Sequence, residues 1–514
     1  MKLVTAKQMR DLDRAAIDGH KIPSLQLMER AGAQVANVIE RDFSSKRGQV
    51  VIVAGKGNNG GDGLVTARHL LGRGYDIAVL LLESSSELSP DARANWELLA
   101  PLTTHIYTAI NIAEMNSRFP ILAEAMCIVD AILGTGLTRE VKDLPAAAID
   151  LINSLGVPVI SIDIPSGLSA DDGLPLGRAI RAKTTVTFGL PKRGLFIAEG
   201  RRYAGEVEIV DIGIPKEEID KVESKLELIE PSLFKGLFKK RKPDSHKGNY
   251  GHVSVFAGSR GHLGAGYLAC LAALRAGAGL ATYCIPEKAF VRFDARYAEV
   301  MCDPIPDDAS ASFHPAGIDA AIKSLAGKSV AVIGPAIGTE AQTRIFVNSF
   351  VKKANIPIII DADGLGVLDL NSLQGRRHAT ILTPHPGEMS RLTGKITKEI
   401  QENRIAFASS FAKQTGTIVV LKGRGTIVAD SSGQIAINPT GNAGMATAGM
   451  GDALTGIIAS FIAQGMSAMD ACMAAVYVHG LAGDLAEKEH TERALITSDV
   501  IKCIGRAIKQ ISDF

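Results

Sequence analysis

Short apolar runs alternate with helical patterns through the first half of the chain, and glycine, proline or charged residues bound each run. Such alternation is typical of a parallel β-sheet whose crossover helices cover it. We therefore predict an α/β domain, with strands at VVIVAG (50–55), IAVLLL (77–82), CIVDAI (127–132), PVISIDI (158–164), TTVTFG (184–189) and GEVEIVDIG (205–213).

A second series of apolar runs follows and ends in long helical patterns toward the C-terminus. Residues 221–251, between the two series, are charged and irregular, and we predict a linker there. Its run Lys239-Lys240-Arg241-Lys242 is interpreted as solvated surface. The second series indicates a separate α/β domain, with strands at HVSVFAG (252–258), LATYCIP (280–286), SVAVIGP (329–335), PIIIDADG (357–364), ATILTP (379–384) and TIVVLKG (417–423).

Length and charge narrow the classes of partner. A chain of 514 residues exceeds the size at which one core keeps growing, so two domains are expected. The formal charge of +1 gives no pull toward nucleic acid or an anionic membrane, which favours small-molecule partners. Glycine is abundant, with 52 residues, and clusters in loops after apolar runs, as in α/β folds with ligand-binding loops.

The cysteines and the N-terminus indicate a cytoplasmic protein. The six cysteines show no metal-ligand or disulfide-framework spacing and are expected to be buried thiols in a reducing compartment. The N-terminal segment is charged every few residues and lacks the apolar stretch of a signal peptide, and no later run is long enough to cross a membrane.

The loop GKGNNG (55–60) matches the glycine pattern of a dinucleotide fingerprint and lies between a predicted strand and a predicted helix. Asn58, Asn59 and Asp62 do not fit that interpretation, because a pyrophosphate prefers bare backbone N–H groups at a helix N-terminus. A Rossmann dehydrogenase with Glu83 at the ribose is one alternative.

Three acidic residues lie at or just past the ends of predicted strands: Asp62, Asp130 and Asp163. Ligands of parallel sheets bind beyond the carboxyl ends of the strands, so the three could converge on one site, although each alone could brace a turn or cap a helix. The oxygens of Asn59, Asp130 and Ser166 suit a hard cation. The turn at residues 134–137 adds backbone N–H donors.

The motifs GNNGGDG, VDAILGTG and SIDIPSG, in this order, resemble the epimerase domain of the NAD(P)H-hydrate repair enzymes over residues 1–222. That family interconverts the R and S forms of hydrated NADH and NADPH (NADHX and NADPHX). The resemblance implies a K⁺ ion held by Asn59, Asp130 and Ser166. It also implies substrate contacts at Asn58, Asn59, Gly60, Gly61, Asp62, Gly134, Thr135, Gly136, Leu137, Thr138, Arg139, Glu140 and Asp163.

Epimerisation at carbon 6 of the nicotinamide ring requires hydroxide to leave and water to return on the other face. One positioned acid/base group suffices for both steps. We predict that Asp163 is that catalytic group, because a carboxyl group can protonate the leaving hydroxyl and then activate the returning water.

In the second half, residues 438–465 form a loop rich in glycine and alanine that runs into a strong helical pattern. Small residues let backbone N–H groups approach an anion at a helix N-terminus. Asp452 lies where the loop becomes helix. It could be an ordinary N-cap, or a general base that deprotonates a hydroxyl attacking a phosphoryl group.

Together with TPHPGE (383–388) and LKGRGT (421–426), this loop resembles the dehydratase domain of the same family over residues 227–514, a ribokinase-like fold. The resemblance implies dehydration of the S hydrate with ADP as co-substrate and Mg²⁺ as cofactor, releasing AMP and phosphate. Asp452 would be catalytic. The implied substrate positions are Ala265, Gly338, His385 and Asp452, and the implied nucleotide positions are Lys422, Gly423, Arg424, Gly425, Thr426 and Gly451.

Ala336 and Ala448 stand where that family usually has glycine, which puts local loop geometry in question. A ribokinase-like small-molecule kinase fused to a nucleotide-binding module is a second alternative, and a non-catalytic nucleotide sensor is a third. We therefore predict a homo-oligomeric, bifunctional repair enzyme that acts on small molecules.

Overall fold

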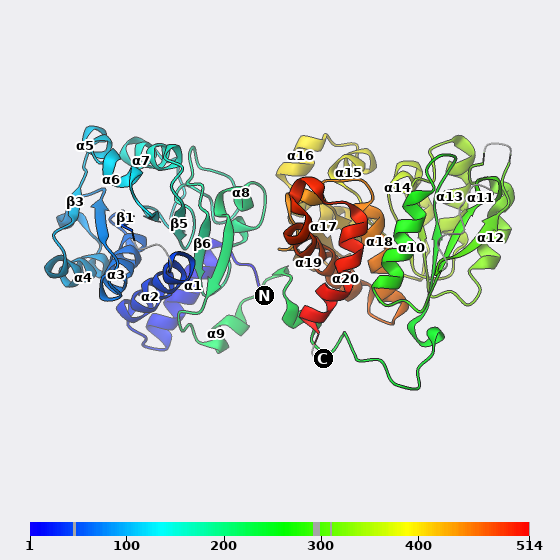
Figure 1. The fold of residues 1–514 in the computed structure, drawn as a ribbon, viewed down its shortest axis with the longest axis horizontal. Helices are drawn as coiled ribbons and strands as arrows, with labels where there is room; N and C mark the ends of the chain where they lie inside the picture. The colour runs from blue at the N-terminus through cyan, green and yellow to red at the C-terminus, as the bar shows by residue number, and fades with distance from the viewer. Residues whose placement is uncertain (45–47, 291–298, 309–310, 513–514) are drawn as a thin grey trace. The chain divides into compact units, whose positions relative to one another are not determined.

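The computed structural model describes residues 1–44, 48–290, 299–308 and 311–512. The chain divides into two compact units, Met1–Ser224 and Lys225–Phe514, and both combine a β-sheet with covering helices (Figure 1). The predicted fold class, two α/β domains in series, is confirmed.

The first unit contains a seven-stranded sheet in the order β3-β2-β1-β4-β5-β6-β7, and every pair of neighbours is parallel. All six predicted strands are present. The sequence analysis missed β3, which has three residues and is only partly buried. The strands are β1 Val50–Ala54, β2 Ile77–Leu81, β3 Ile106–Thr108, β4 Cys127–Ala131, β5 Val159–Ile162, β6 Thr184–Phe188 and β7 Glu206–Val210.

Helices cover both faces of this sheet, because alternate residues of each buried strand point to opposite sides. Val50 and Ile52 join the core under α1 to α4, whereas Val51 and Val53 join the core under α5 to α7. The helices are α1 Ala6–Arg14, α2 Ser24–Phe43, α3 Asn58–Gly72, α4 Pro90–Leu99, α5 Ile112–Ser117, α6 Phe119–Ala123, α7 Asp143–Ser154, α8 Gly200–Ala204 and α9 Lys216–Lys221.

The second unit contains a ten-stranded sheet in the order β11-β10-β9-β12-β13-β14-β15-β16-β17-β8. Neighbouring strands in this sheet are parallel, except that β16 is antiparallel to both β15 and β17. The strands are β8 Leu226–Leu228, β9 His252–Phe256, β10 Leu280–Pro286, β11 Met301–Ile305, β12 Val330–Ile333, β13 Ile358–Ile360, β14 Thr380–Leu382, β15 Ile418–Leu421, β16 Ile427–Ala429 and β17 Ile435–Ile437.

Helices α10, α18, α19 and α20 pack together around the main core of this unit. Buried aromatic rings form a second packed group. It includes Phe256 of β9 and Phe350 of α13, whose ring centroids are 4.6 Å apart. The helices are α10 Gly264–Arg275, α11 Glu287–Phe290, α12 Ile318–Ser324, α13 Ala341–Lys353, α14 Asp363–Val367, α15 Pro386–Thr393, α16 Thr397–Glu402, α17 Arg404–Thr415, α18 Met450–Ala463, α19 Ala468–Ala494 and α20 Thr497–Ile511.

The prediction that residues 221–251 form an irregular linker without a strand is wrong. Leu226–Leu228 forms β8, which pairs in parallel with β17, and Phe234 is 1% exposed in the core of the second unit. Three-residue strands give no readable alternation, so the charged flanks dominated the pattern. The basic run at 239–242 is exposed, and Arg241 stacks on the ring of Tyr250 at 3.8 Å.

All six cysteines are free thiols, and each lies in the part of the chain that the structure describes. Burial raises the pKa of the Cys127 thiol to about 12, so it stays protonated near neutral pH. Within the described ranges, no helix has both the length and the apolar character needed to cross a bilayer.

Candidate active sites

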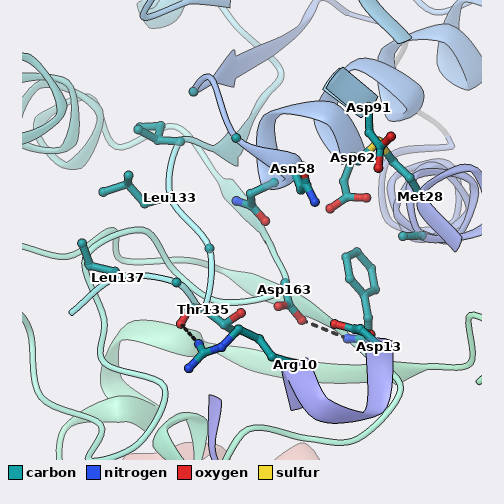
Figure 2. Close-up of a pocket in the computed structure, with 18 of the residues that line it drawn as sticks. Arg10, Asp13, Met28, Asn58, Asp62, Asp91, Leu133, Thr135, Leu137 and Asp163 are labelled. Atoms are coloured by element: carbon teal, nitrogen blue, oxygen red, sulfur yellow. Dashed lines mark hydrogen bonds between the residues drawn. The ribbon is translucent and has the colours of Figure 1, made fainter. Parts of the chain in front are cut away.

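The first unit has a cavity of ≈ 680 Å³ lined by the loops that follow β1 and β4. The strand order reverses between these two strands, and such a switch point opens a crevice beyond the carboxyl ends of a parallel sheet. Figure 2 shows this cavity, with Asn58, Asp62, Thr135 and Asp163 around it. The predicted site residues that line it are Asn58, Asn59, Asp62, Gly134, Thr135, Gly136, Leu137 and Asp163.

Five other predicted substrate residues do not line this cavity: Gly60, Gly61, Thr138, Arg139 and Glu140. The two glycines are buried and serve close packing, since a Cβ on Gly60 would strike the carbonyl oxygen of Gly55, and one on Gly61 would lie 2.7 Å from the sulfur of Met28. The glycine pattern thus lets α3 begin immediately after the loop, with its first N–H groups at the cavity.

Asp163 sits in the turn after β5 with a left-handed backbone, φ 64°. Few side chains adopt that conformation without strain, and aspartate tolerates it better than most. Its backbone N–H donates to the carbonyl of Val186 at 2.8 Å, which ties the turn to β6. Its Oδ1 accepts hydrogen bonds from the Thr187 hydroxyl at 3.3 Å and the Phe188 N–H at 3.2 Å.

Lys192 is a site residue that the sequence analysis missed. It is fully buried, and its Nζ forms an ion pair with Asp163 and donates to the Thr187 hydroxyl at 3.2 Å and the Phe188 carbonyl at 2.9 Å. A single lysine after an apolar strand has no periodic signal that would have revealed it.

Four further carboxyl groups line the same cavity, those of Asp13, Asp62, Glu83 and Asp91, and the pKa values of the first two are raised. Asp13 of α1, which the sequence analysis also missed, has its pKa raised to about 6 by burial, although Lys192 opposes the shift. Burial and the neighbouring Asp163 and Asp13 raise the pKa of Asp62 well above the usual range. The site therefore contains one ion-paired aspartate and two aspartates whose pKa values are raised by burial.

The proposed cation ligands Asp130 and Ser166 are fully buried and do not line the cavity. Asp130 is fully buried and accepts hydrogen bonds from the Ser166 hydroxyl at 2.5 Å and the Ser161 hydroxyl at 2.8 Å. Ser166 Oγ in turn accepts from the Leu133 N–H at 2.8 Å, beside Gly134, whose added Cβ would lie 3.3 Å from the Cβ of Asn59.

Asn59 is the third proposed cation ligand, and its side-chain amide lacks a hydrogen-bond partner. Its Nδ2 is buried and has no hydrogen-bond partner in the described part of the chain. A rotated amide would place its oxygen at this point instead, and an unpartnered buried oxygen is a ligand for a hard cation. The three side chains therefore fit a K⁺ ion by donor chemistry.

The second unit has a cavity of ≈ 820 Å³. Its walls come from the loop after β15, the loop that precedes α18, and α19, which contributes His479. Of the predicted nucleotide-binding residues, Gly425 does not line it, whereas Lys422, Gly423, Arg424, Thr426 and Gly451 do. Cationic side chains and glycine N–H groups at a helix N-terminus suit a phosphate-bearing ligand.

Lys422 is paired with Asp361, a buried residue that follows β13 and that the sequence analysis did not single out. The Nζ–Oδ1 distance is 2.5 Å, and Glu388 Oε2 lies 3.8 Å from the same Nζ. Burial opposes the charged lysine, but Asp361 and Glu388 outweigh it and raise the pKa of Lys422. A carbon placed on Gly451 would lie 3.2 Å from this Nζ, so the ammonium faces the start of α18.

Asp452 lies in the first turn of α18, whose N-cap is Gly449 with φ 88°, and no side chain makes a capping hydrogen bond there. The N-cap alternative for Asp452 is therefore wrong. Burial and the neighbouring Asp361 raise the pKa of Asp452 to about 7, against the opposing effect of Lys422. A carboxyl group with this pKa can exchange protons near neutral pH.

None of the four predicted substrate residues, Ala265, Gly338, His385 and Asp452, lines this cavity, although Gly451, next to Asp452, does. Gly338 and His385 contact carboxylates that help to raise the pKa of Asp452. The Gly338 N–H donates to Asp363 at 3.1 Å, and the His385 N–H donates to Glu388 at 2.7 Å. His385 also caps α15, because its Nδ1 accepts from the Gly387 N–H at 3.0 Å. Ala265 lies in the first turn of α10.

Ala336 and Ala448, the two positions where the family usually has glycine, differ in backbone conformation. Ala336 has φ 51°, a left-handed conformation that favours glycine. Ala448 is not among the residues with positive φ, and its carbonyl accepts from the Thr497 hydroxyl at 2.7 Å. The departure therefore strains the loop at Ala336 and has no such effect at Ala448.

Within the described ranges, no group of three or more His, Cys, Asp or Glu residues could hold a metal ion. Mg²⁺ commonly binds through one or two carboxylates together with substrate phosphates. The carboxylates near Lys422 therefore fit an ion that arrives with a nucleotide, rather than a preformed cage.

Fold and sites together define an enzyme with two α/β units, in which the first cavity is suited to proton transfer and the second to binding a phosphate-bearing ligand. Family models support this class: residues 24–194 match the YjeF-related protein N-terminus, and residues 253–506 match NAD(P)H-hydrate dehydratase. A curated relative, the bifunctional NAD(P)H-hydrate repair enzyme Nnr of Moorella thermoacetica, is 38% identical over 517 residues, covering 100% of this chain and 98% of that protein.

The Nnr protein of Escherichia coli is 33% identical, covering 98% of this chain and 93% of that protein. A solved structure of the ADP/ATP-dependent NAD(P)H-hydrate dehydratase of Bacillus subtilis, co-crystallised with ATP and Mg²⁺, is 30% identical with a TM-score of 0.49, covering 55% of this chain and 98% of that chain. The chain belongs to the family of bifunctional NAD(P)H-hydrate repair enzymes.

Proposed function

We propose that this protein repairs hydrated NADH and NADPH. Residues 1–222 epimerise the R and S hydrates at carbon 6 of the nicotinamide ring. Residues 227–514 dehydrate the S hydrate with ADP and release AMP and phosphate. The observation that supports this division most directly is the chemical contrast between a carboxyl-rich cavity in the first unit and a cationic, glycine-walled cavity in the second.

In the first unit, Asp163 is the proposed acid/base group. Its turn aims the carboxyl group into the cavity, and the ion pair with Lys192 fixes the position of the carboxyl oxygens. The N–H groups at the start of α3 and the loop 134–137 are the proposed contacts for the nucleotide. Asn59, Asp130 and Ser166 would hold K⁺, which would supply positive charge beside the substrate.

In the second unit, the proposed nucleotide site consists of Lys422 to Thr426 and Gly451. Asp452 takes the proton from the ring hydroxyl, whose oxygen attacks the β-phosphorus of ADP, and AMP is the leaving group. The phosphorylated ring then loses phosphate with the help of the nitrogen lone pair. Mg²⁺, bound with the nucleotide, would neutralise charge on the phosphate oxygens.

The protein is also proposed to be cytoplasmic and homo-oligomeric, with ADP preferred to ATP and with NADHX and NADPHX as substrates. Its free cysteines are compatible with a reducing compartment. Exposed apolar side chains near the edge strand β3, at Leu102 (57%) and Ile110 (60%), offer surface that association would bury.

A mixture of R and S hydrates, incubated with the protein and either ADP or ATP, tests the proposal. With ADP, both hydrates should be consumed and the reduced nicotinamide absorbance should recover. One AMP should be released for each NADH or NADPH that is restored. A stable phosphorylated product with no recovered NADH would instead identify a kinase. Recovery that stops when the S hydrate is spent would remove the epimerase activity.

A further inference from the structure

Helix α1 directs a carboxyl group without a partner into the first cavity. Met9 and Leu12 of this helix pack into the core, whereas Arg10 and Asp13 line the cavity. The Asp13 carboxyl group makes no hydrogen bond or ion pair with the described residues, and Figure 2 shows it beside Asp163. A half-buried aspartate with no partner has no evident structural purpose.

The buried lysine of the site cannot serve Asp13 as a hydrogen-bond donor. An ammonium group has three N–H donors, and Lys192 directs them at Asp163, at the Thr187 hydroxyl and at the Phe188 carbonyl. Lys192 therefore neutralises Asp163 at close range and affects Asp13 only through space.

The other cations of the cavity do not balance the remaining acids. Arg10 reaches the Thr135 carbonyl at 3.4 Å, and Lys56 pairs with Glu83 at 3.3 Å at the exposed rim. Asp62 and Asp91 also line the cavity. Burial raises the pKa of Asp13 to about 6 and raises the pKa of Asp62 well above its usual range, so these two acids retain protons more readily than exposed aspartates do.

We propose that Asp13 is a second catalytic residue of the epimerase site and exchanges a proton with the substrate oxygen in partnership with Asp163. The assignment rests on the proposed function. The leaving hydroxyl and the returning water occupy opposite faces of the nicotinamide ring, and two groups on separate elements serve two faces more directly than one group does.

The proton inventory of the step is balanced. The C6–O bond breaks, the ring nitrogen forms a C=N double bond, and the protonated aspartate gives its proton to the departing oxygen, which leaves as water. A second water then forms the new C6–O bond and gives a proton to the other aspartate. The two aspartates hold one proton before and after, and no atom is oxidised or reduced.

This mechanism has a pH signature. The equilibrium between the two hydrates involves no proton, so kcat/KM must depend on pH in the same way in both directions. The active form needs one shared proton. Because the pKa of Asp13 is about 6, kcat/KM for epimerisation should fall as the pH rises through that region, about tenfold per unit.

The test compares Asp13→Asn, Asp13→Glu and Asp11→Asn in the full chain, starting from each pure hydrate between pH 5.5 and 8, with the uncatalysed rate subtracted. Asp11 is the matched control, since it lies on the same helix but pairs with Lys7 at 2.7 Å on the exposed side. Asp13→Asn should lower kcat/KM by roughly 10² to 10⁴ and abolish the alkaline fall, while ADP-driven dehydration of the S hydrate stays intact.

Asp13→Glu should retain part of the rate and the alkaline fall, and Asp11→Asn should match the wild type. An Asp13→Asn variant that keeps the wild-type rate and pH profile would overturn the role of Asp13 alone. A wild-type protein that leaves the R hydrate to its spontaneous rate would overturn the proposed epimerase function as well.

Discussion

The two units each bury one lysine against an aspartate that follows a parallel strand, but the two lysines use their donors differently. Lys192 directs all three donors at protein acceptors, around Asp163. The Lys422 ammonium group makes one hydrogen bond with the described residues, to Asp361, and its Nζ faces Gly451 at the start of α18. The second lysine therefore keeps donors for a ligand, and the first does not.

This difference matches the chemistry of each cavity. A lysine whose donors are all used holds the Asp163 carboxyl group in place and offers no donor to a ligand, which suits proton exchange by Asp163 and Asp13 at a neutral ring carbon. A lysine with free donors beside glycine N–H groups suits phosphate oxygens, which carry charge into the site. Under the proposed function, the same kind of lysine–aspartate pair serves proton transfer in the first unit and anion binding in the second.

The largest expected effect comes from Asp452→Asn. The amide keeps the shape of the side chain but cannot accept the proton of the ring hydroxyl, so dehydration turnover should fall by roughly 10² to 10⁴. ADP affinity should be unchanged or higher, because one negative charge near the phosphates is gone. Turnover and ADP binding measured on the same variant check this prediction.

The thermal midpoint is the control for Asp452→Asn. Burial raises the folded-state pKa of Asp452 above its unfolded value, so the wild type loses free energy of unfolding as the pH rises from about 4 to 7. The amide has no such loss, and its midpoint at pH 8 should equal or exceed that of the wild type. Near-normal turnover with a lowered midpoint would give Asp452 a structural role and place the base elsewhere.

Replacing each lysine by methionine should separate the two roles. Lys192→Met leaves the Asp163 carboxylate buried without its cation, and the free energy of unfolding of the first unit should fall by about 3–5 kcal/mol. Lys422→Met should weaken ADP binding roughly 10- to 100-fold, because hydrogen bonds between charged groups are lost. Thermal unfolding and ADP titration of both variants measure these effects. If both variants lost ADP affinity equally, the claim that only Lys422 binds the nucleotide would be wrong.

The two activities should respond to pH in opposite directions. Dehydration needs Asp452 deprotonated and, with a pKa of about 7, should rise about tenfold per unit below that pH and level off above it. Epimerisation needs the proton stored near Asp13 and should fall with increasing pH. Profiles of kcat/KM for both activities on one preparation check this, and parallel profiles would contradict the assignment of base and acid.

The smallest expected effect concerns Ala336→Gly. Glycine relieves the left-handed backbone, worth about 1–2 kcal/mol, but adds roughly 0.5–1 kcal/mol of chain entropy on unfolding. The free energy of unfolding of the second unit should therefore rise by up to about 1.5 kcal/mol. Ala448→Gly is the matched control and should bring no gain in chemical denaturation, so a gain at both positions would count against the strain argument.

Sequence patterns were sufficient where the fold relies on buried apolar runs. The six strands predicted in each series lie in runs of mostly apolar residues, as buried parallel strands do, and β13 and β14 were predictable from such runs although each has only three residues. The strands β3, β8, β16 and β17 also have three residues, but they lie among charged, polar and turn-forming residues, so no strand was predicted there. The five-residue strand β11 includes Asp303 and Pro304, which interrupt an apolar pattern.

The candidate sites were predictable to the extent that their residues lie in glycine-rich loops after strands. Asn58, Asp62 and the Lys422 loop follow this rule. Asp13, Lys192 and Asp361 contribute through tertiary packing instead. Asp13 comes from a helix that precedes the first strand, and nothing in its local sequence distinguishes it from the other charged residues of α1.

The division of labour between the two units is tested most directly with pure R hydrate, ADP and three proteins: the wild type, Asp163→Asn and Asp452→Asn. The wild type should restore reduced nicotinamide absorbance to completion. Asp163→Asn should restore it only at the spontaneous epimerisation rate, yet act normally on pure S hydrate. Asp452→Asn should accumulate the S hydrate without recovery. Rapid recovery from the R hydrate by Asp163→Asn, or loss of both activities in either variant, would contradict the account.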